Sequence, residues 1–153
     1  MTMEPPLAQV VEFQPMSVND ADYLYDLCEA TMRRYTEIVW GHWNETGSRR
    51  FFRDAVAKGE FDSICKNGKR IGAVSVQIHP SCHQLEQLYI EPSRQNQGYG
   101  TVVVGKILAA AALDSKPVRL RVLKPNPAKR LYERLGFVVT QTTPERYFME
   151  HQG

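Results

Sequence analysis

The stretch Gln95-Asn96-Gln97-Gly98-Tyr99-Gly100 decides the predicted fold, because it joins two segments of different periodicity. The strand-like run at 85–90 (LEQLYI) enters it, and the apolar, helix-like run at 101–113 leaves it. The first N–H groups of a helix lack a partner within the helix and carry the positive end of its dipole, and glycine lets a ligand approach the backbone closely. We therefore predict an anion-binding turn between a strand and a helix.

Three strands are expected to lead into this turn. Asn67-Gly68 separates strand-like runs at 61–66 and 70–79, and both residues of this pair can take the positive φ that a tight hairpin requires. The run at 84–90 supplies the next strand. On the N-terminal side we expect a loose tail at 1–7 and a strand at 9–15. A helix should start at 17–20, with Ser17 as its cap, and continue or break near 35, and a second helix is expected at 49–57.

The residues after the turn complete the predicted sheet. The run at 118–122 (VRLRV) alternates with period two, so a strand, a helix and a strand follow one another, which implies a right-handed parallel crossover. Pro125-Asn126-Pro127 opens another helix, and a hairpin at 137–142 and 146–150 follows it. The prediction is one domain over 1–153 of the α/β class (α+β type), with a mixed, mostly antiparallel sheet of six to seven strands, about four helices and one parallel strand-helix-strand crossover.

The composition narrows the choice of partners. Of the 153 residues, 42% are hydrophobic and 24% charged, which suits one globular domain with a sizeable core. The formal charge of +2 is too mild for nucleic-acid binding. No N-terminal run resembles a signal peptide, and no apolar run approaches the roughly 20 residues of a membrane helix. We expect a cytoplasmic protein that binds neither nucleic acid nor a membrane.

The cysteines and histidines do not form a recognisable metal or disulfide pattern. Cys28, Cys65 and Cys82 are few, odd in number and widely spaced, so no disulfide framework is indicated. His79, Cys82 and His83 cluster between two expected strands, but their spacing matches no zinc motif and a fourth ligand is missing. We therefore expect no metal.

Three phosphate-binding motifs compete for the glycine turn. A dinucleotide fingerprint would need a third glycine where Val103 stands. The run at 100–106 fits the start of a nucleotide-triphosphate loop, but Ile107 follows where a magnesium-binding Ser or Thr is required. The third pattern, Gln/Arg-x-x-Gly-x-Gly/Ala, is matched by Gln95, Gly98 and Gly100.

A second block stands downstream of this third pattern. It begins with Leu120-x-Val122-x-x-x-Asn126 and continues to 131–137 (LYERLGF). Together the two blocks resemble the GNAT superfamily of acetyl-CoA-dependent N-acetyltransferases. From about 61 to 150, the expected strands and helices follow one another in the same order as in this family. The first 58 residues match it only in having two helices of the right sort.

The resemblance implies that the turn holds the pyrophosphate of coenzyme A and that the strand before it pairs with the pantetheine arm. Such pairing requires neighbouring strands to splay apart, and a β-bulge near Glu86 or Gln87 would be a natural cause. Lys129 and Arg130 could reach the adenosine phosphates or could be solvated surface. The implied cofactor-binding residues are Leu88, Tyr89, Ile90, Gln95, Asn96, Gln97, Gly98, Tyr99, Gly100, Thr101, Asn126, Lys129 and Tyr132.

Two residues are candidates for proton transfer during direct acetyl transfer. Tyr132 matches the family's tyrosine beside the thioester sulfur, where a side chain with a pKa of about 10 keeps a proton to give to the thiolate; the alternative is that it only packs in its helix. Glu86 is the best candidate base, and the alternative is an exposed strand carboxylate. His42 and His83 are weaker candidates for the base.

The acceptor is expected to enter between the first two helices and the last hairpin. Aromatic and cationic residues there suit a small amine with an apolar or carboxylate-bearing body, although two tryptophans can equally form a packed corner. The candidate substrate-binding residues are Arg33, Tyr35, Trp40, Trp43, Glu86 and Tyr147, with Arg34 and His42 beside them.

The predicted activity is N-acetyl transfer to the primary amine of a small molecule. A protein N-terminus or lysine as acceptor is one alternative, and a non-catalytic acyl-CoA-binding module is another. The sequence does not fix the oligomeric state; a homodimer is compatible with it.

Overall fold

The computed structural model describes residues 10–152, so the tail expected at 1–7 and the first residues of the strand expected at 9–15 lie outside the described residues. Within this range the chain forms one mixed sheet with the strand order β1-β2-β3-β4-β5-β7-β6. The strands are β1 (Val11–Pro15), β2 (Asp62–Lys66), β3 (Lys69–Ile78), β4 (His83–Ile90), β5 (Val118–Leu123), β6 (Val138–Thr142) and β7 (Arg146–His151). The helices are α2 (Ala21–Trp40), α3 (Glu45–Ala57), α4 (Tyr99–Leu113) and α5 (Ala128–Arg134), with short 3-10 turns η1 (Val18–Asp20) and η2 (Pro92–Arg94).

The sheet has the predicted topology. All neighbouring strands are antiparallel except β4 and β5, which are parallel and joined through α4. The β2–β3 hairpin turns at Asn67 and Gly68, whose φ values of 51° and 80° are those expected for this pair. The mixed, mostly antiparallel α/β fold is confirmed.

The first two helices start at other residues than predicted. The segment 18–20, expected to begin the first helix, forms η1, and α2 begins at Ala21. α2 continues through Tyr35 and stops at Gly41, which takes φ 81° and donates its N–H to the carbonyl of Glu37. α3 begins four residues before the expected start, because the side chain of Asn44 caps it by accepting the N–H of Gly47 at 2.9 Å. Trp40 is the last residue of α2.

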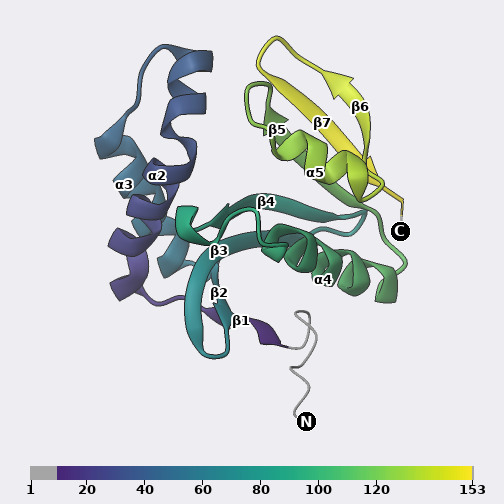
Figure 1. Cartoon of the computed structure of the whole chain (residues 1–153), viewed down its shortest axis with the longest axis horizontal. Coiled ribbons are helices and arrows are strands. Elements are labelled where there is room, and N and C mark those ends of the chain that lie inside the picture. The colour runs from purple at the N-terminus through teal and green to yellow at the C-terminus, as the bar shows by residue number, and fades with distance from the viewer. Residues whose placement is uncertain (1–9, 153) are drawn as a thin grey trace.

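Helices cover both faces of the sheet (Figure 1). Ala73 packs with the residues of α2 and α3, whereas its neighbour Val74 packs with those of α4 and α5. Successive residues of a strand point to opposite faces, so the two helix pairs lie on opposite sides of the sheet. None of the described helices is long and apolar enough to cross a membrane.

β4 and β5 separate at a β-bulge. Ser75 pairs with Gln87 and Val76 with Leu85, so Glu86 is the extra residue of β4. The parallel pairing with β5 covers only residues 83–85 of β4. Beyond Leu85 the edge of β4 that faces β5 has no strand partner, and Figure 1 shows the two strands separating there. The predicted bulge and splay are confirmed.

Candidate active site

Two cavities meet where β4 separates from β5. The turn cavity, of about 570 Å³, lies between α2, the end of β4, the start of α4 and α5. The aromatic cavity, of about 550 Å³, lies between α2, α3, β4 and β5. Both are lined by Met32, Leu88, Tyr89, Asn126 and Tyr132. Two molecules bound in the two cavities would therefore meet at these five residues.

The turn cavity is built on the start of α4. Gly98 takes φ 89° and Asn96 φ 61°, which reverses the chain between the strand and the helix. The first helical hydrogen bond runs from the N–H of Val102 to the carbonyl of Gly98 at 3.2 Å, so the N–H groups before it have no partner in the helix. The side chain of Gln95 donates to the carbonyl of Ile90 at 3.0 Å and closes the turn on the strand. The arrangement offers backbone donors to an anion.

Most of the predicted cofactor-binding residues line the turn cavity: Leu88, Tyr89, Ile90, Gln95, Asn96, Gly98, Tyr99, Gly100, Thr101, Asn126 and Tyr132. Two predicted residues lie elsewhere. Gln97 donates from its side chain to the carbonyl of Ser93 at 3.0 Å. Lys129 lies 3.3 Å from the carboxylate of Glu133 and 4.5 Å from the ring centre of Tyr147.

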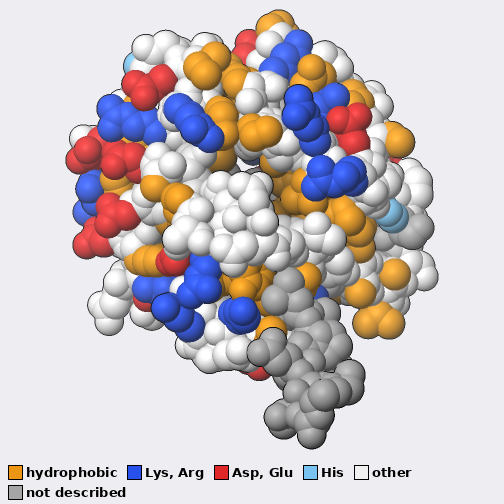
Figure 2. Space-filling model, in the orientation of Figure 1, with side chains coloured by type: hydrophobic (Ala, Val, Ile, Leu, Met, Phe, Trp, Pro, Cys, Tyr) orange, Lys and Arg blue, Asp and Glu red, His pale blue; other side chains and the backbone are white. Residues whose placement is uncertain are grey.

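Arginines make the turn cavity cationic. Its lining includes Arg34, Arg94, Arg130 and Arg134 and no Asp or Glu. Figure 2 shows Lys and Arg side chains on both sides of the hollow between α2 and α5. Arg34 lies over the ring of Tyr35 at 4.8 Å and donates to its hydroxyl at 2.6 Å. A polyanion such as a diphosphate would be held from several sides.

Tyr132 stands between the two cavities. It is 7% exposed, and its ring packs edge-on against Phe137 at 5.7 Å. Burial raises the pKa of Tyr132 to about 12. Its hydroxyl makes no hydrogen bond with another residue that the structure describes. A phenol that stays protonated at neutral pH and faces two cavities is suited to donate a proton.

Asn126 closes the wall opposite β4. Its side-chain oxygen accepts the N–H of Ala128 at 2.9 Å, which fixes the first turn of α5. Its amide nitrogen lies 3.7 Å from the sulfur of Met32 on α2. Asn126 thus joins α2 to α5 at the level where the cavities meet.

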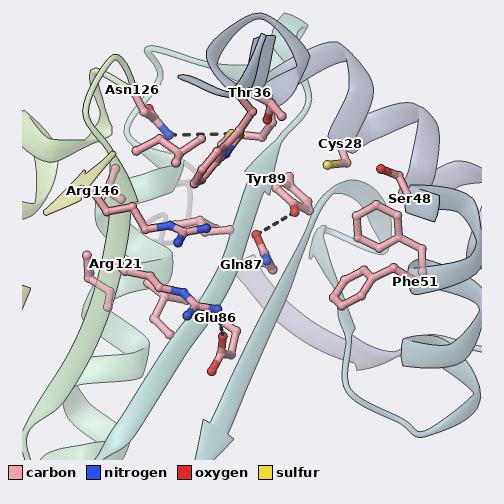
Figure 3. Close-up of a pocket in the computed structure, with 18 of the residues that line it drawn as sticks. Cys28, Thr36, Ser48, Phe51, Glu86, Gln87, Tyr89, Arg121, Asn126 and Arg146 are labelled. Atoms are coloured by element: carbon pink, nitrogen blue, oxygen red, sulfur yellow. Dashed lines mark hydrogen bonds and ion pairs between the residues drawn. The ribbon is translucent and has the colours of Figure 1, made fainter. Parts of the chain in front are cut away.

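Glu86 enters the aromatic cavity from the bulge of β4 (Figure 3). Its side chain is 21% exposed, and a carboxylate oxygen lies 3.6 Å from a guanidinium nitrogen of Arg121 on β5. The bulge aims the carboxylate at the cavity, where it can accept a proton from a ligand. Arg121 holds it from the facing strand.

The predicted substrate-binding residues divide into two groups. Trp40 and Trp43 line the aromatic cavity together with Glu86. The indole N–H of Trp43 also donates to the hydroxyl of Tyr25 at 3.0 Å, so Trp43 is part of the packed corner as well. His42 hydrogen-bonds the carbonyl of Trp40 at 3.0 Å.

Other predicted substrate-binding residues do not line the aromatic cavity. Tyr35 lines the turn cavity. Arg33 is paired with Glu29 and Glu37 of its own helix. The ring of Tyr147 packs beneath the ammonium groups of Lys124 and Lys129. The pattern of the sequence could not separate these positions, because they stand on the same elements as the cavity residues.

Several residues of the aromatic cavity were not predicted: Cys28, Ser48, Phe51, Gln87, Arg121 and Arg146, all labelled in Figure 3. The side-chain oxygen of Gln87 accepts the hydroxyl of Tyr89 at 2.7 Å. Burial raises the pKa of the Cys28 thiol to about 11, which keeps it neutral. Arg121 could have been found from the alternation of β5, but nothing in the sequence singles out Arg146.

Residues 10–152 contain no group of three or more His, Cys, Asp or Glu that could hold a metal ion. Of the cluster considered from the sequence, His83 is buried and lies 2.7 Å from the carboxylate of Asp114. That contact fastens β4 to the residue that follows α4.

Solved structures of other proteins are similar to this chain in fold. PaiA N-acetyltransferase from Thermoplasma acidophilum, solved in complex with coenzyme A, aligns with a TM-score of 0.72 and 18% identity over 94% of this chain and 99% of its own. An acetyltransferase from Thermus thermophilus aligns with a TM-score of 0.73 and 17% identity over 93% of this chain and 96% of its own. Arabidopsis thaliana Naa50, in complex with the bisubstrate analogue CoA-Ac-MVNAL, aligns with a TM-score of 0.66 and 16% identity over 93% of this chain and 98% of its own.

These structures share the fold. No curated protein sequence gives a significant match. The model of the acetyltransferase (GNAT) family matches residues 24–137, which include both cavities' shared wall and the glycine turn. The chain therefore belongs to the acetyltransferase (GNAT) family.

Proposed function

We propose that the protein transfers an acetyl group from acetyl-CoA to the primary amine of a small molecule. The observation that carries this proposal is the meeting of the turn cavity and the aromatic cavity at Leu88 and Tyr132. A long anionic donor would fill the first cavity and an amine the second. The acetyl group would then pass directly from donor to amine within the ternary complex, without an intermediate that moves between sites.

The donor fits the turn cavity in three parts. The N–H groups at the start of α4 suit the pyrophosphate, and Arg130 and Arg134 on α5 add charge-assisted donors. The unpaired edge of β4 near Leu88 suits the amide groups of the pantetheine arm. The T. acidophilum relative contains coenzyme A, which supports the same ligand here.

The proton movements then fall to two side chains. Acetyl-CoA, when bound, supplies the thioester that the amine attacks. Glu86 accepts the proton that the ammonium group must lose, and Tyr132 donates one to the sulfur as the C–S bond breaks and the C–N bond forms. An N–H near Leu88 polarises the carbonyl. Cys28 takes no part, because its raised pKa of about 11 keeps it a thiol.

The test is a calorimetric titration with acetyl-CoA followed by an amine screen with thiol detection. We expect saturable binding and thiol release with at least one small primary amine. Absence of binding at high micromolar acetyl-CoA would remove the premise. Binding without turnover on any amine would favour the non-catalytic acyl-CoA-binding module.

A peptide acceptor is the second candidate, and one feature favours it. A third cavity, of about 560 Å³, lies over β5, β6 and β7 and shares Glu86, Leu120 and Arg121 with the aromatic cavity. An extended chain could continue along this face. Naa50 is solved with a bisubstrate analogue carrying a peptide. Peptides that are acetylated with a kcat/KM well above that of any small amine would establish this alternative.

A further inference from the structure

Arg146 is a cation in the aromatic cavity that no acidic residue neutralises. It stands at the start of β7 and points into the cavity in Figure 3. Its guanidinium lies over the ring of Trp40 from α2, 5.6 Å from the ring centre. Among the described residues, none accepts a hydrogen bond from its side chain or forms an ion pair with it. The guanidinium donors are therefore available to a ligand.

The other charges of this cavity balance each other. Its charged lining residues are Glu86, Arg121 and Arg146. Glu86 and Arg121 lie 3.6 Å apart and neutralise one another. The remaining positive charge would repel an acceptor that carries only an ammonium group, as alkylamines do near neutral pH. An acceptor with an added anionic group would be attracted instead.

The position of Arg146 favours a carboxylate as that anionic group. A guanidinium that lies over an aromatic ring keeps its in-plane N–H groups at its edge, and two of them match the two oxygens of a carboxylate. Trp40 is 43% exposed, so the pair stands near the mouth of the cavity. Phe51, Phe52 and Trp43 offer an apolar surface for the body of the ligand.

We propose that the acceptor is an amine that also bears a carboxylate, such as an amino acid, and that Arg146 binds this carboxylate while the amine faces Glu86 and Tyr132. The inference rests on the proposed acetyl transfer and names its substrate class. It makes Arg146 a residue that determines specificity without taking part in proton transfer.

The test compares matched pairs of acceptors. Amino acids with a terminal amine and two to six carbons, and phenylalanine, are each assayed against their own carboxamides by thiol release. We expect the wild-type protein to prefer the acids by about 10- to 100-fold in kcat/KM, because only they complete the bidentate contact. Arg146→Met should abolish the preference through a higher KM for the acids, while turnover of the carboxamides persists.

Two variants serve as references. Arg53→Met removes one exposed cation from α3 outside the cavity lining and should keep the wild-type preference. Arg146→Lys keeps the charge but loses the planar pair of donors and should show an intermediate preference. Comparing the acid-to-carboxamide ratio between variants cancels the different basicities of the amines.

The outcomes separate the two proposals. If wild type acetylates carboxamides as well as acids, or if Arg146→Met keeps the preference, carboxylate recognition by Arg146 is wrong while acetyl transfer stands. If no amine of either kind is acetylated, the proposed function fails and the inference with it. If thermal unfolding shows that Arg146→Met is not folded, the acid-to-carboxamide ratios of the wild type and of Arg146→Lys test the inference instead. Equal ratios in these two proteins would contradict it.

Discussion

At the scale of single residues, Tyr132 and Glu86 have different surroundings although we propose that both act in the same reaction. Tyr132 is buried against Phe137, which keeps its proton in place. Glu86 stands on a bulge and is held by Arg121 across the splayed strands. These surroundings lead to separate predictions for the two side chains.

Replacing Tyr132 with Phe should lower kcat by about 100-fold or more, within the range for general acid catalysis. The ring contact with Phe137 remains, and the lost hydroxyl has no partner among residues 10–152, so the unfolding free energy should change little. Steady-state kinetics and urea unfolding measure the two effects. Unchanged kcat would show that Tyr132 only packs.

Replacing Glu86 with Gln should lower kcat/KM by about 100-fold near neutral pH, because nothing then accepts the ammonium proton. The defect should shrink as the pH rises toward the amine pKa of about 10, where the acceptor arrives already neutral. A pH–rate profile measures this recovery. Glu12→Gln changes an exposed strand carboxylate on β1 and should leave the profile unaltered. A defect that does not depend on pH would contradict the role of base.

At the scale of elements, the close approach of β3 and β4 positions the strand that we propose binds the donor. A Cβ atom on Gly72 of β3 would lie 2.2 Å from the carbonyl oxygen of Tyr89 and 3.2 Å from the Cα atom of Ile90. Only glycine fits there without moving β4. The edge of β4 proposed to pair with pantetheine thus depends on a residue of the strand behind it.

Gly72→Ala should lower the unfolding free energy by about 1–3 kcal/mol, as overpacking usually does, and should weaken acetyl-CoA binding because β4 shifts. Gly105→Ala is the matched control, since its Cβ would meet nothing within 4 Å in the interior of α4. It should stabilise the protein by up to about 1 kcal/mol. Thermal unfolding compares the stability of the two variants, and calorimetry compares their binding of acetyl-CoA. If both variants have the same stability and affinity, the close approach at Gly72 does not position β4.

At the scale of the whole molecule, burial of a thiol and a phenol makes stability depend on pH. The folded protein raises the pKa of Cys28 from 9.0 to about 11 and that of Tyr132 from 10.0 to about 12. Both groups stay protonated in the fold at a pH where the unfolded chain has begun to release its protons. Their contribution is therefore complete below pH 9 and is lost as the pH rises through about 11 to 12.

The unfolding free energy should accordingly fall between pH 9 and pH 11, by on the order of 2 kcal/mol for Cys28. Urea unfolding at several pH values measures the slope. Cys28→Ala should make the decline shallower in this interval, whereas Cys82→Ala, at a buried thiol between β3 and β4, is the comparison variant and should leave the decline unaltered. A decline that Cys28→Ala leaves unaltered would show that other groups cause it.

The sequence alone determined the local chemistry of the chain. Residues 95–101 specified the turn, Asn67-Gly68 specified the hairpin, and the order of strands and helices specified the mixed sheet, because backbone conformation and periodicity depend on neighbouring residues. These features pointed to the family whose model matches the chain. The bulge expected near Glu86 or Gln87 was implied by the resemblance to that family, whose cofactor needs one free edge of the strand.

Only the tertiary structure decided which side chains meet in the cavities. α2, β4 and β7 are distant in sequence, and their packing places Tyr35 beside the turn but Trp40 beside Arg146. It also determines that Glu86 is neutralised by Arg121 while Arg146 is not. The proposed acceptor site depends on these long-range contacts, whose distances no local pattern encodes. The proposed donor site depends largely on one continuous turn.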